Sequence, residues 1–309
     1  MADLALIKKL RETTGCGIAD CNKALAENAD DFEKSVDWLR KKGLSAAIKK
    51  GGRITSEGIV AVQIKGSDAV ILEVNSETDF VSRNQKFQDF VKDIASVSFG
   101  CGDNVEKLKA VKYPNLPNTV DEELKNQIGV IGENINIRRV GNLSSKNGLM
   151  VSYVHNAVAP NLGKIAVLVA LESTNTDKET LAKLEEFGKQ IAMHIAAAKP
   201  DSLSIDVVDA AKLEREIDIL REQAKSSGKP DSIIEKMMEG RVKKYYEEVV
   251  LLEQNFVMDD KVKIKDLLKN FSKEIGSETT ISGFKLFILG EGIEKKETDF
   301  AAEVASMAQ

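Results

Sequence analysis

The spacing of hydrophobic residues changes along the chain and separates helix-forming from strand-forming parts. In the first part, apolar side chains recur three or four positions apart in three stretches, which is typical of short amphipathic helices. The stretches cover residues 4–10, 20–25 and 31–39. Thr14-Gly15-Cys16-Gly17 separates the first two, Asp30-Asp31 is suited to cap the third, and Gly43 is expected to end it. We predict a three-helix module over residues 1–54, with a hinge at Lys49-Lys50-Gly51-Gly52.

Patterning typical of strands begins after the hinge. Residues 59–64 and 69–74 are almost continuously apolar and rich in β-branched side chains, and Lys65-Gly66-Ser67-Asp68 between them is a turn sequence. This pattern predicts an antiparallel hairpin. A helix with Phe90 directed inward follows, and another helix is expected to begin near Asp121.

The hairpin and its helix occur twice in the sequence. The matching segments are 57–60 with 147–150, 69–74 with 166–171, and 90–95 with 187–192. Chance similarity between apolar strands is the simpler explanation, but matching order and spacing in three places favour a duplicated unit. We therefore predict a core of two halves, which cover 55–143 in the first half, and 144–203 with 256–293 in the second.

A different pattern fills the gap in the second half, at residues 204–255. Apolar residues there alternate at steps of three and four, with charged side chains on the other faces, which indicates two antiparallel helices that meet along a seam. The seam residues are Leu213, Ile217, Leu220, Ala224, Ile234, Met238, Val242, Tyr245, Val249 and Leu252. After a further helix and strand, a last helix is expected from about Thr298. The fold class is therefore α+β, with a helical module, a duplicated antiparallel β-hairpin/helix core, an inserted antiparallel coiled-coil hairpin and a C-terminal helical module.

The composition excludes several classes of function. Charged residues make up 30% of the 309 positions and the formal net charge is −5, which argues against a polyanion-binding surface over the whole chain. Three cysteines are an odd number and too few to staple a chain of this length, so they are interpreted as reduced thiols. No apolar run approaches the roughly 20 residues of a membrane span. We expect a cytoplasmic protein.

Residues able to carry out covalent chemistry are sparse. Cys16 and Cys21 do not have the spacing of a CxxC redox pair. His155 and His194 are the two histidines of the chain, and two ligands make a poor metal site, so we interpret His194 as a packing residue. Gly228-Lys229-Pro230 lacks the glycine spacing and the Ser/Thr of a phosphate-binding loop. We predict no enzymatic activity, no metal and no cofactor.

One loop differs between the two copies of the repeat. Thr78-Asp79-Phe80-Val81 follows the second strand of the first half, whereas the second half has Thr176-Asp177-Lys178 in the equivalent region. Divergence of a loop on a repeated scaffold often marks function. Two interpretations remain open: Phe80 folds back into its own core, as most large aromatics do, or it is an exposed anchor for a pocket on a partner. In the second case Asp79 supplies charge at the rim, and Val81 and Arg83 flank the contact.

Motifs along nearly the whole chain are similar to those of a known family. They lie at residues 10–21 (LRETTGCGIADC), 73–81 (EVNSETDFV), 131–139 (IGENINIRR), 152–155, 191–194, 227–230, 239–241, 290–294 and 297–301. In this order they resemble the bacterial translation elongation factor Ts family, the guanine-nucleotide exchange factors of elongation factor Tu. The resemblance implies a ubiquitin-associated-like module at 1–54, a two-part α+β core, a coiled-coil hairpin at 204–255 and a C-terminal module at 294–309.

The resemblance also implies a partner and the residues that contact it. In the family, the aromatic of the Thr-Asp-Phe-Val loop enters an apolar pocket of elongation factor Tu and the magnesium and phosphate site is disturbed, so that GDP leaves. The expected partner-binding residues are Thr78, Asp79, Phe80, Val81, Arg11, Ile18, Ala19, Ile131, Gly132 and His155. The family often has a bulky apolar residue where this chain has Ala19. The expected partner is elongation factor Tu in its GDP-bound and nucleotide-free forms, without direct binding to nucleic acid or membrane.

Two other functions are compatible with parts of the sequence. An adaptor of the ubiquitin-associated type would bind its partner through residues 1–54, whatever happens at Phe80. A thiol enzyme would use Cys16 or Cys21 and would be inactivated by alkylation. The order and coverage of the motifs favour an exchange factor over both.

Overall fold

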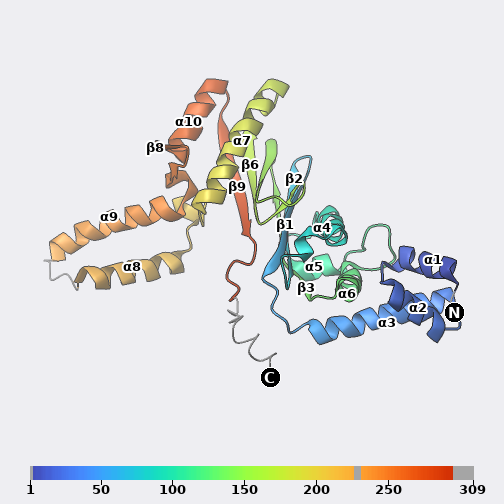
Figure 1. Cartoon of the computed structure of the whole chain (residues 1–309). Coiled ribbons are helices and arrows are strands. Elements are labelled where there is room, and N and C mark those ends of the chain that lie inside the picture. Colours follow the sequence, from blue (N-terminus) through green and yellow to red (C-terminus); the bar gives the residue numbers. More distant parts are fainter. Residues whose placement is uncertain (1–2, 226–230, 295–309) are drawn as a thin grey trace.

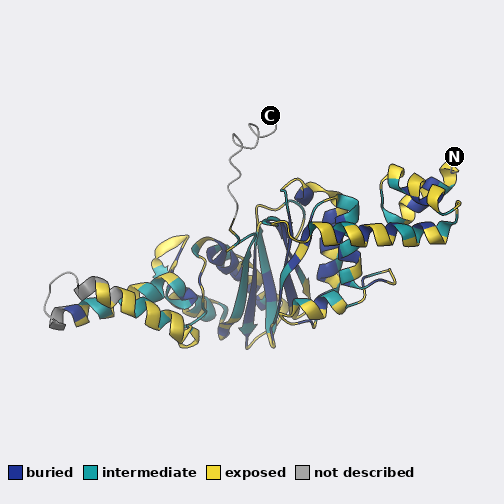
Figure 2. Cartoon of the chain, turned by 90° about the horizontal axis from the view of Figure 1, so that it is seen from below, coloured by how far each residue is buried: buried dark blue, intermediate teal, exposed yellow. Residues whose placement is uncertain are grey.

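Two β-sheets packed face to face form the centre of the molecule, and helices cover the outer face of each (Figure 1). The computed structural model describes residues 3–225 and 231–294. A three-helix module lies at one end of the elongated chain and a helical hairpin at the other (Figure 2). This mixture of helices and antiparallel sheets confirms the predicted α+β class.

The N-terminal module consists of three helices whose ends follow the sequence signals. The helices are α1 (Leu4–Thr14), α2 (Ile18–Glu27) and α3 (Phe32–Lys50). Asp3 caps α1 by accepting a hydrogen bond from the N–H of Ala5, and Asp31 caps α3 by accepting one from Lys34. Gly15 ends α1 at φ 70°, a left-handed conformation that suits glycine. A small core holds the helices together and contains Ile7, Leu10, Cys21, Ala24, Leu25 and Leu39.

Helix α3 does not end at Gly43, so the predicted stop there is wrong. The helix continues to Lys50 and crosses α6 (Val120–Ile131), where Gly43 faces Gly129. A Cβ atom at Gly129 would lie 2.8 Å from the Cα of Gly43, so the crossing leaves no room for a side chain there. Gly43 therefore serves the close approach of two helices, and α3 joins the module to the core as one helix.

The first sheet contains four antiparallel strands in the order β3-β2-β1-β5. The strands are β1 (Glu57–Lys65), β2 (Asp68–Ser76), β3 (Ile135–Ser144) and β5 (Leu162–Gly163). Helices α4 (Gln85–Val97), α5 (Val105–Ala110) and α6 cover its outer face, where Phe87 and Phe90 pack. Because the other face meets the second sheet, β1 and β2 are buried on both sides, which explains their continuous apolar runs.

The second sheet contains three antiparallel strands in the order β4-β6-β9. The strands are β4 (Gly148–His155), β6 (Ile165–Ser173) and β9 (Thr279–Ile288). Helices α7 (Lys178–Ala198) and α10 (Ile264–Ile275) pack on its outer face, where the rings of Phe187 and Phe271 stack with centroids 4.1 Å apart. The inner face meets the first sheet through Val60, Val62, Ala69, Ile71, Met150, Ala166, Leu168 and Ala170.

The two halves correspond beyond the segments in which the sequence repeat is visible. The ladder between the second and third strands shifts register at the same place in both, after Glu73 in the first half and after Ala170 in the second. The helix before the third strand also ends alike, on a left-handed glycine that is Gly132 in the first half and Gly276 in the second. The repeated unit therefore includes a third strand and a second helix, and β3 was not predicted.

A helical hairpin projects from the second half, within the predicted range 204–255. Its helices α8 (Ala210–Lys225) and α9 (Asp231–Val249) run antiparallel (Figure 1), and a short ribbon of β7 (Asn255–Phe256) and β8 (Asp259–Lys263) follows. Its coiled-coil character, and the likeness of the first module to a ubiquitin-associated domain, stay predictions. The tip at 226–230 and the predicted C-terminal module beyond Glu294 lie outside the described residues. Among the described helices, none is long and apolar enough to cross a membrane.

Candidate partner-binding site

The loop between β2 and α4 holds Phe80 out in solvent. The Phe80 side chain is 79% exposed, and Asp79 beside it is exposed as well. The interpretation in which Phe80 folds back into its own core is therefore wrong. A large apolar side chain presented in this way, next to a carboxylate, is a surface suited to fill a pocket in another protein.

Val81 explains why the neighbouring aromatic points outward. Its side chain is only 5% exposed and packs in the core of the first half, so it is not available as the predicted flanking contact. A 3-10 turn, Val81–Arg83, begins there and is held by Ser82, whose hydroxyl donates to the carbonyl oxygen of Asp79 at 2.5 Å. With Val81 anchored inward and Ser82 buried, the turn directs Phe80 to the opposite side.

Two carboxylates connect this loop to the segment that follows α6. Glu133 accepts two hydrogen bonds from Thr78, one from its N–H (2.9 Å) and one from its hydroxyl (2.6 Å). In the other direction, Glu77 accepts a hydrogen bond from the N–H of Asn134 (2.6 Å) and lies 3.4 Å from the guanidinium of Arg53. Glu133 was not among the predicted site residues, although it lies inside one of the motifs.

These bonds bring the predicted residues Ile131 and Gly132 beside the loop. Gly132 is the exposed left-handed cap of α6 and directly precedes Glu133. Lys50 at the end of α3 donates a hydrogen bond to the carbonyl oxygen of Gly132. The end of α3, the end of α6 and the Phe80 loop therefore meet at one place on the surface.

The predicted residues of the N-terminal module face solvent near the same region. Arg11, Ile18 and Ala19 are all exposed, with Ile18 among the exposed large hydrophobic side chains. The loop between them is tied to the start of α4 because Lys86 donates from Nζ to the carbonyl oxygen of Gly15 at 2.7 Å. The chain thus holds the module next to the helix that follows Phe80.

His155 lies on the second sheet, at its end nearest to the loop. The residue is exposed at the end of β4, and its Nδ1 is 3.0 Å from the hydroxyl of Tyr153. It pairs with Ile165, and the adjacent Lys164 reaches Glu57 at the start of β1, with 3.8 Å between the charged atoms. His155 therefore belongs to the same end of the core as Phe80, although no direct bond joins the two.

The thiols and the buried histidine do not form a reactive centre. Burial raises the pKa of both Cys16 and Cys21, so at neutral pH these thiols are protonated and poorly nucleophilic. The Nδ1 of His194 accepts a hydrogen bond from Val257 (3.2 Å), so the proton is on Nε2, which donates to Gln254 (2.9 Å). His194 is therefore a packing residue, as predicted. The described part of the chain contains no cluster of three or more potential metal ligands.

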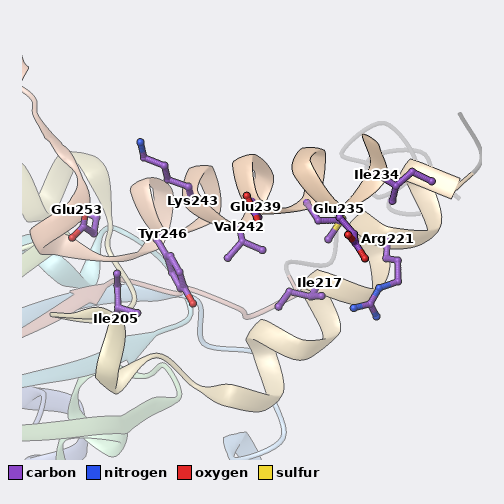
Figure 3. A pocket seen from close by; sticks show the side chains of 11 residues that line it. Ile205, Ile217, Arg221, Ile234, Glu235, Glu239, Val242, Lys243, Tyr246 and Glu253 are labelled. Atoms are coloured by element: carbon purple, nitrogen blue, oxygen red, sulfur yellow. The ribbon is translucent and has the colours of Figure 1, made fainter. Parts of the chain in front are cut away.

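A separate cavity of about 850 Å³ opens between α8 and α9 (Figure 3). Its walls combine apolar side chains such as Ile217 and Val242 with charges of both signs, among them Arg221 and Glu239. The hairpin lies on the far side of the sheets from the N-terminal module (Figure 1). This cavity is therefore distinct from the surface around Phe80.

Comparison with known proteins assigns the chain to a family. Residues 77–291 match the family model described as "Elongation factor TS". The chain belongs to the elongation factor Ts family. Relatives with the name "Elongation factor Ts" include that of Rhodospirillum centenum, 54% identical over 304 residues that cover 98% of each chain. Those of Bartonella tribocorum and Rhizobium etli are 50% and 49% identical over 302 residues, which cover 98% of this chain and 97% of theirs. As a member of the elongation factor Ts family, the chain is a nucleotide exchange factor of protein biosynthesis.

Proposed function

We propose that this chain binds elongation factor Tu through Phe80 and Asp79 and promotes the release of GDP by disturbing the partner's magnesium and phosphate site. The exposure of Phe80, on a loop held by hydrogen bonds on both sides, is the observation that supports this most directly. Because the loop is already ordered, little conformational entropy is lost on binding. Asp79 adds a negative charge beside the ring, which opposes the phosphates and competes for the metal.

The release of GDP follows from thermodynamic linkage. A factor that binds the nucleotide-free partner more tightly than the GDP-bound partner weakens GDP binding by the same factor. The energy for release therefore comes from the contacts, those of Phe80 among them, that the chain makes more strongly with the nucleotide-free partner, and the chain makes or breaks no covalent bond. The cysteine thiols are protonated and His194 is a buried packing residue, which is consistent with a function that needs no covalent chemistry.

The other predicted residues would widen the contact around the loop. Ile131 and Gly132 lie next to Thr78 through Glu133, so they would extend the interface with the same domain of the partner. Ile18 and Ala19, with Arg11, form a second exposed patch on the N-terminal module, and His155 forms a third on the second sheet. We propose elongation factor Tu, both GDP-bound and nucleotide-free, as the partner for all of them.

The direct test is the release of a fluorescent GDP analogue from elongation factor Tu, with and without the chain. An exposed phenylalanine offers roughly 150 Å² of apolar surface, equivalent to about 4 kcal/mol at about 25 cal/mol/Å². Association and ordering reduce this gain, so Phe80→Ala should lower exchange efficiency by about 2 kcal/mol, or about thirtyfold. Because Phe80 is exposed, the free energy of unfolding should stay within about 0.5 kcal/mol of the parent.

Met258→Ala is a matched control, since Met258 is an exposed large apolar residue in the β7-β8 ribbon of the other half. It should leave both exchange and stability unchanged. Equal exchange by the Phe80→Ala variant and the parent would overturn the proposal. An adaptor that works through the first module would instead lose its partner on Ile18→Ala and remain unaffected by Phe80→Ala.

A further inference from the structure

Glu133 has an arrangement that the exchange function does not by itself require. Its carboxylate bonds both the N–H and the hydroxyl of Thr78, two positions before Phe80. Hydrogen bonds to a charged acceptor are stronger than those between neutral groups. Glu77 also accepts a hydrogen bond from the N–H of Asn134. Two consecutive loop residues, Glu77 and Thr78, are therefore hydrogen-bonded to two consecutive residues after α6, Asn134 and Glu133.

The second half of the core contains the corresponding contact in a weaker form. Ser277 follows Gly276 as Glu133 follows Gly132, and its hydroxyl accepts a hydrogen bond from the N–H of Asn175 at 2.9 Å. Asn175 lies 97 positions after Thr78, the offset of the repeat. The repeated scaffold therefore fastens this loop in both halves, but only in the first half does a carboxylate bind it at two points. That is also the half in which the loop carries Phe80.

We propose that Glu133 is a positioning residue that holds the loop in the conformation in which Phe80 faces the partner. The inference rests on the proposed function of Phe80. The side chain of Glu133 acts through Thr78 and leaves the contact with the partner to Phe80. Its position is set by the backbone, because Gly132 takes the left-handed φ of 87° that turns the chain back from α6 toward β2.

Loss of Glu133 should lower the fraction of the free protein whose loop is in the binding-competent conformation. Without Glu133 the loop samples further conformations, and the apparent dissociation constant rises by the inverse of the competent fraction. Once the complex has formed, the loop is in place, so the maximal rate of nucleotide release is retained. If Glu133 instead stabilised the transition state of nucleotide release directly, its substitution would lower the maximal rate.

The experiment measures release of a fluorescent GDP analogue from elongation factor Tu over a range of concentrations of the full chain. Glu133→Ala should raise the half-saturating concentration about tenfold and leave the plateau rate within about twofold. Thr78→Val, which removes only the hydroxyl donor, should raise it about threefold. Ser277→Ala is the control: it removes the equivalent contact in the second half and should leave the half-saturating concentration unchanged.

The decisive comparison is made in the absence of the aromatic. If Glu133 acts through Phe80, Glu133→Ala introduced into the Phe80→Ala variant should change the half-saturating concentration by less than about twofold. Effects that multiply independently would overturn the positioning role and indicate a direct contact of Glu133 with the partner. Thermal unfolding of each variant is measured in parallel, and Thr78→Val provides the test if Glu133→Ala does not fold.

Failure of this inference and failure of the proposed function give different results. If Phe80→Ala leaves exchange intact, the proposed function is wrong. If Phe80→Ala impairs exchange while neither Glu133→Ala nor Thr78→Val raises the half-saturating concentration, only the positioning role is wrong.

Discussion

The buried carboxylate of Glu73 is expected to make a large contribution to the stability of the core. Glu73 lies on β2 with no exposed surface and accepts hydrogen bonds from Arg138 (3.0 Å), Arg139 (2.6 Å) and Asn75 (3.0 Å). A fourth comes from the N–H of Gly290 (2.8 Å), just after β9. This carboxylate therefore fastens two strands of the first sheet to the segment that follows β9.

Glu73→Gln keeps the shape of the side chain and removes its charge. Breaking one partner of a buried ion pair costs about 3–5 kcal/mol. Both arginines are about a quarter exposed, at 25% and 29%, so water can partly replace the lost carboxylate. We therefore expect the lower end, a loss of about 3 kcal/mol in the free energy of unfolding.

The same contacts set a dependence on pH. Burial on its own would raise the pKa of Glu73, but the hydrogen bonds from Gly290 and Asn75 and the guanidinium of Arg139 outweigh it and hold the pKa below its ordinary value. With a lowered folded-state pKa, the stabilisation is complete above the ordinary value of 4.5 and is lost as the pH falls through the folded pKa. Glu73→Gln should therefore reduce the loss of stability on acidification below that value.

Urea unfolding at about pH 7 and about pH 4 measures both effects. Glu291→Gln is the matched control, because Glu291 contacts the same Arg139 at 3.3 Å but its side chain is 50% exposed. An exposed pair contributes at most about 1 kcal/mol, so this variant should remain close to the parent. Equal losses for the two variants would refute the claim that burial of the Glu73 network determines its contribution.

Two further predictions concern the helix crossing and the buried histidine. Gly129→Ala places a Cβ against the backbone of Gly43 and should lower the free energy of unfolding by about 1–3 kcal/mol, as measured by urea unfolding. The control is Gly240→Ala, at a helical glycine whose Cβ would meet open space, and it should not destabilise the chain. Burial lowers the pKa of His194, so the unfolded chain takes up a proton before the folded one, and stability should fall as the pH drops below the ordinary value of 6.5. His194→Gln should flatten that dependence, and an unchanged pH profile would contradict this account.

Much of the fold could be predicted from local patterning. Strands β1 and β2 are recognisable in the sequence as β-branched runs separated by a turn. Asp31 and Gly15 mark helix ends because their residue types favour capping conformations. The exchange role came from motif order, with Phe80 singled out because its repeat partner has no aromatic. These signals lie in neighbouring residues or in the order of motifs along the chain, which is why they could be found without a structure.

The errors share a different origin, since each depends on contacts between distant segments. Gly43 looks like a helix stop until Gly129, from another helix, is seen to press against it. Strand β3 was missed because Arg138 and Arg139 interrupt its apolar pattern, and only the buried Glu73 explains why they are placed there. Glu133 could have been found only if the repeat had been traced to the glycines that precede it and Ser277.

Because α3 is continuous through its crossing with α6, it sets a fixed distance between the N-terminal module and the core. A flexible connection would let the patches at Ile18 and Phe80 settle on surfaces at many separations, whereas one helix pressed against another fixes their span. A second contact adds to affinity only when the geometry allows both to form together. Proteins with suitable pockets at another separation would thus engage one patch and gain nothing from the other. Discrimination between partners would then depend partly on this distance, which the close approach of Gly43 and Gly129 maintains.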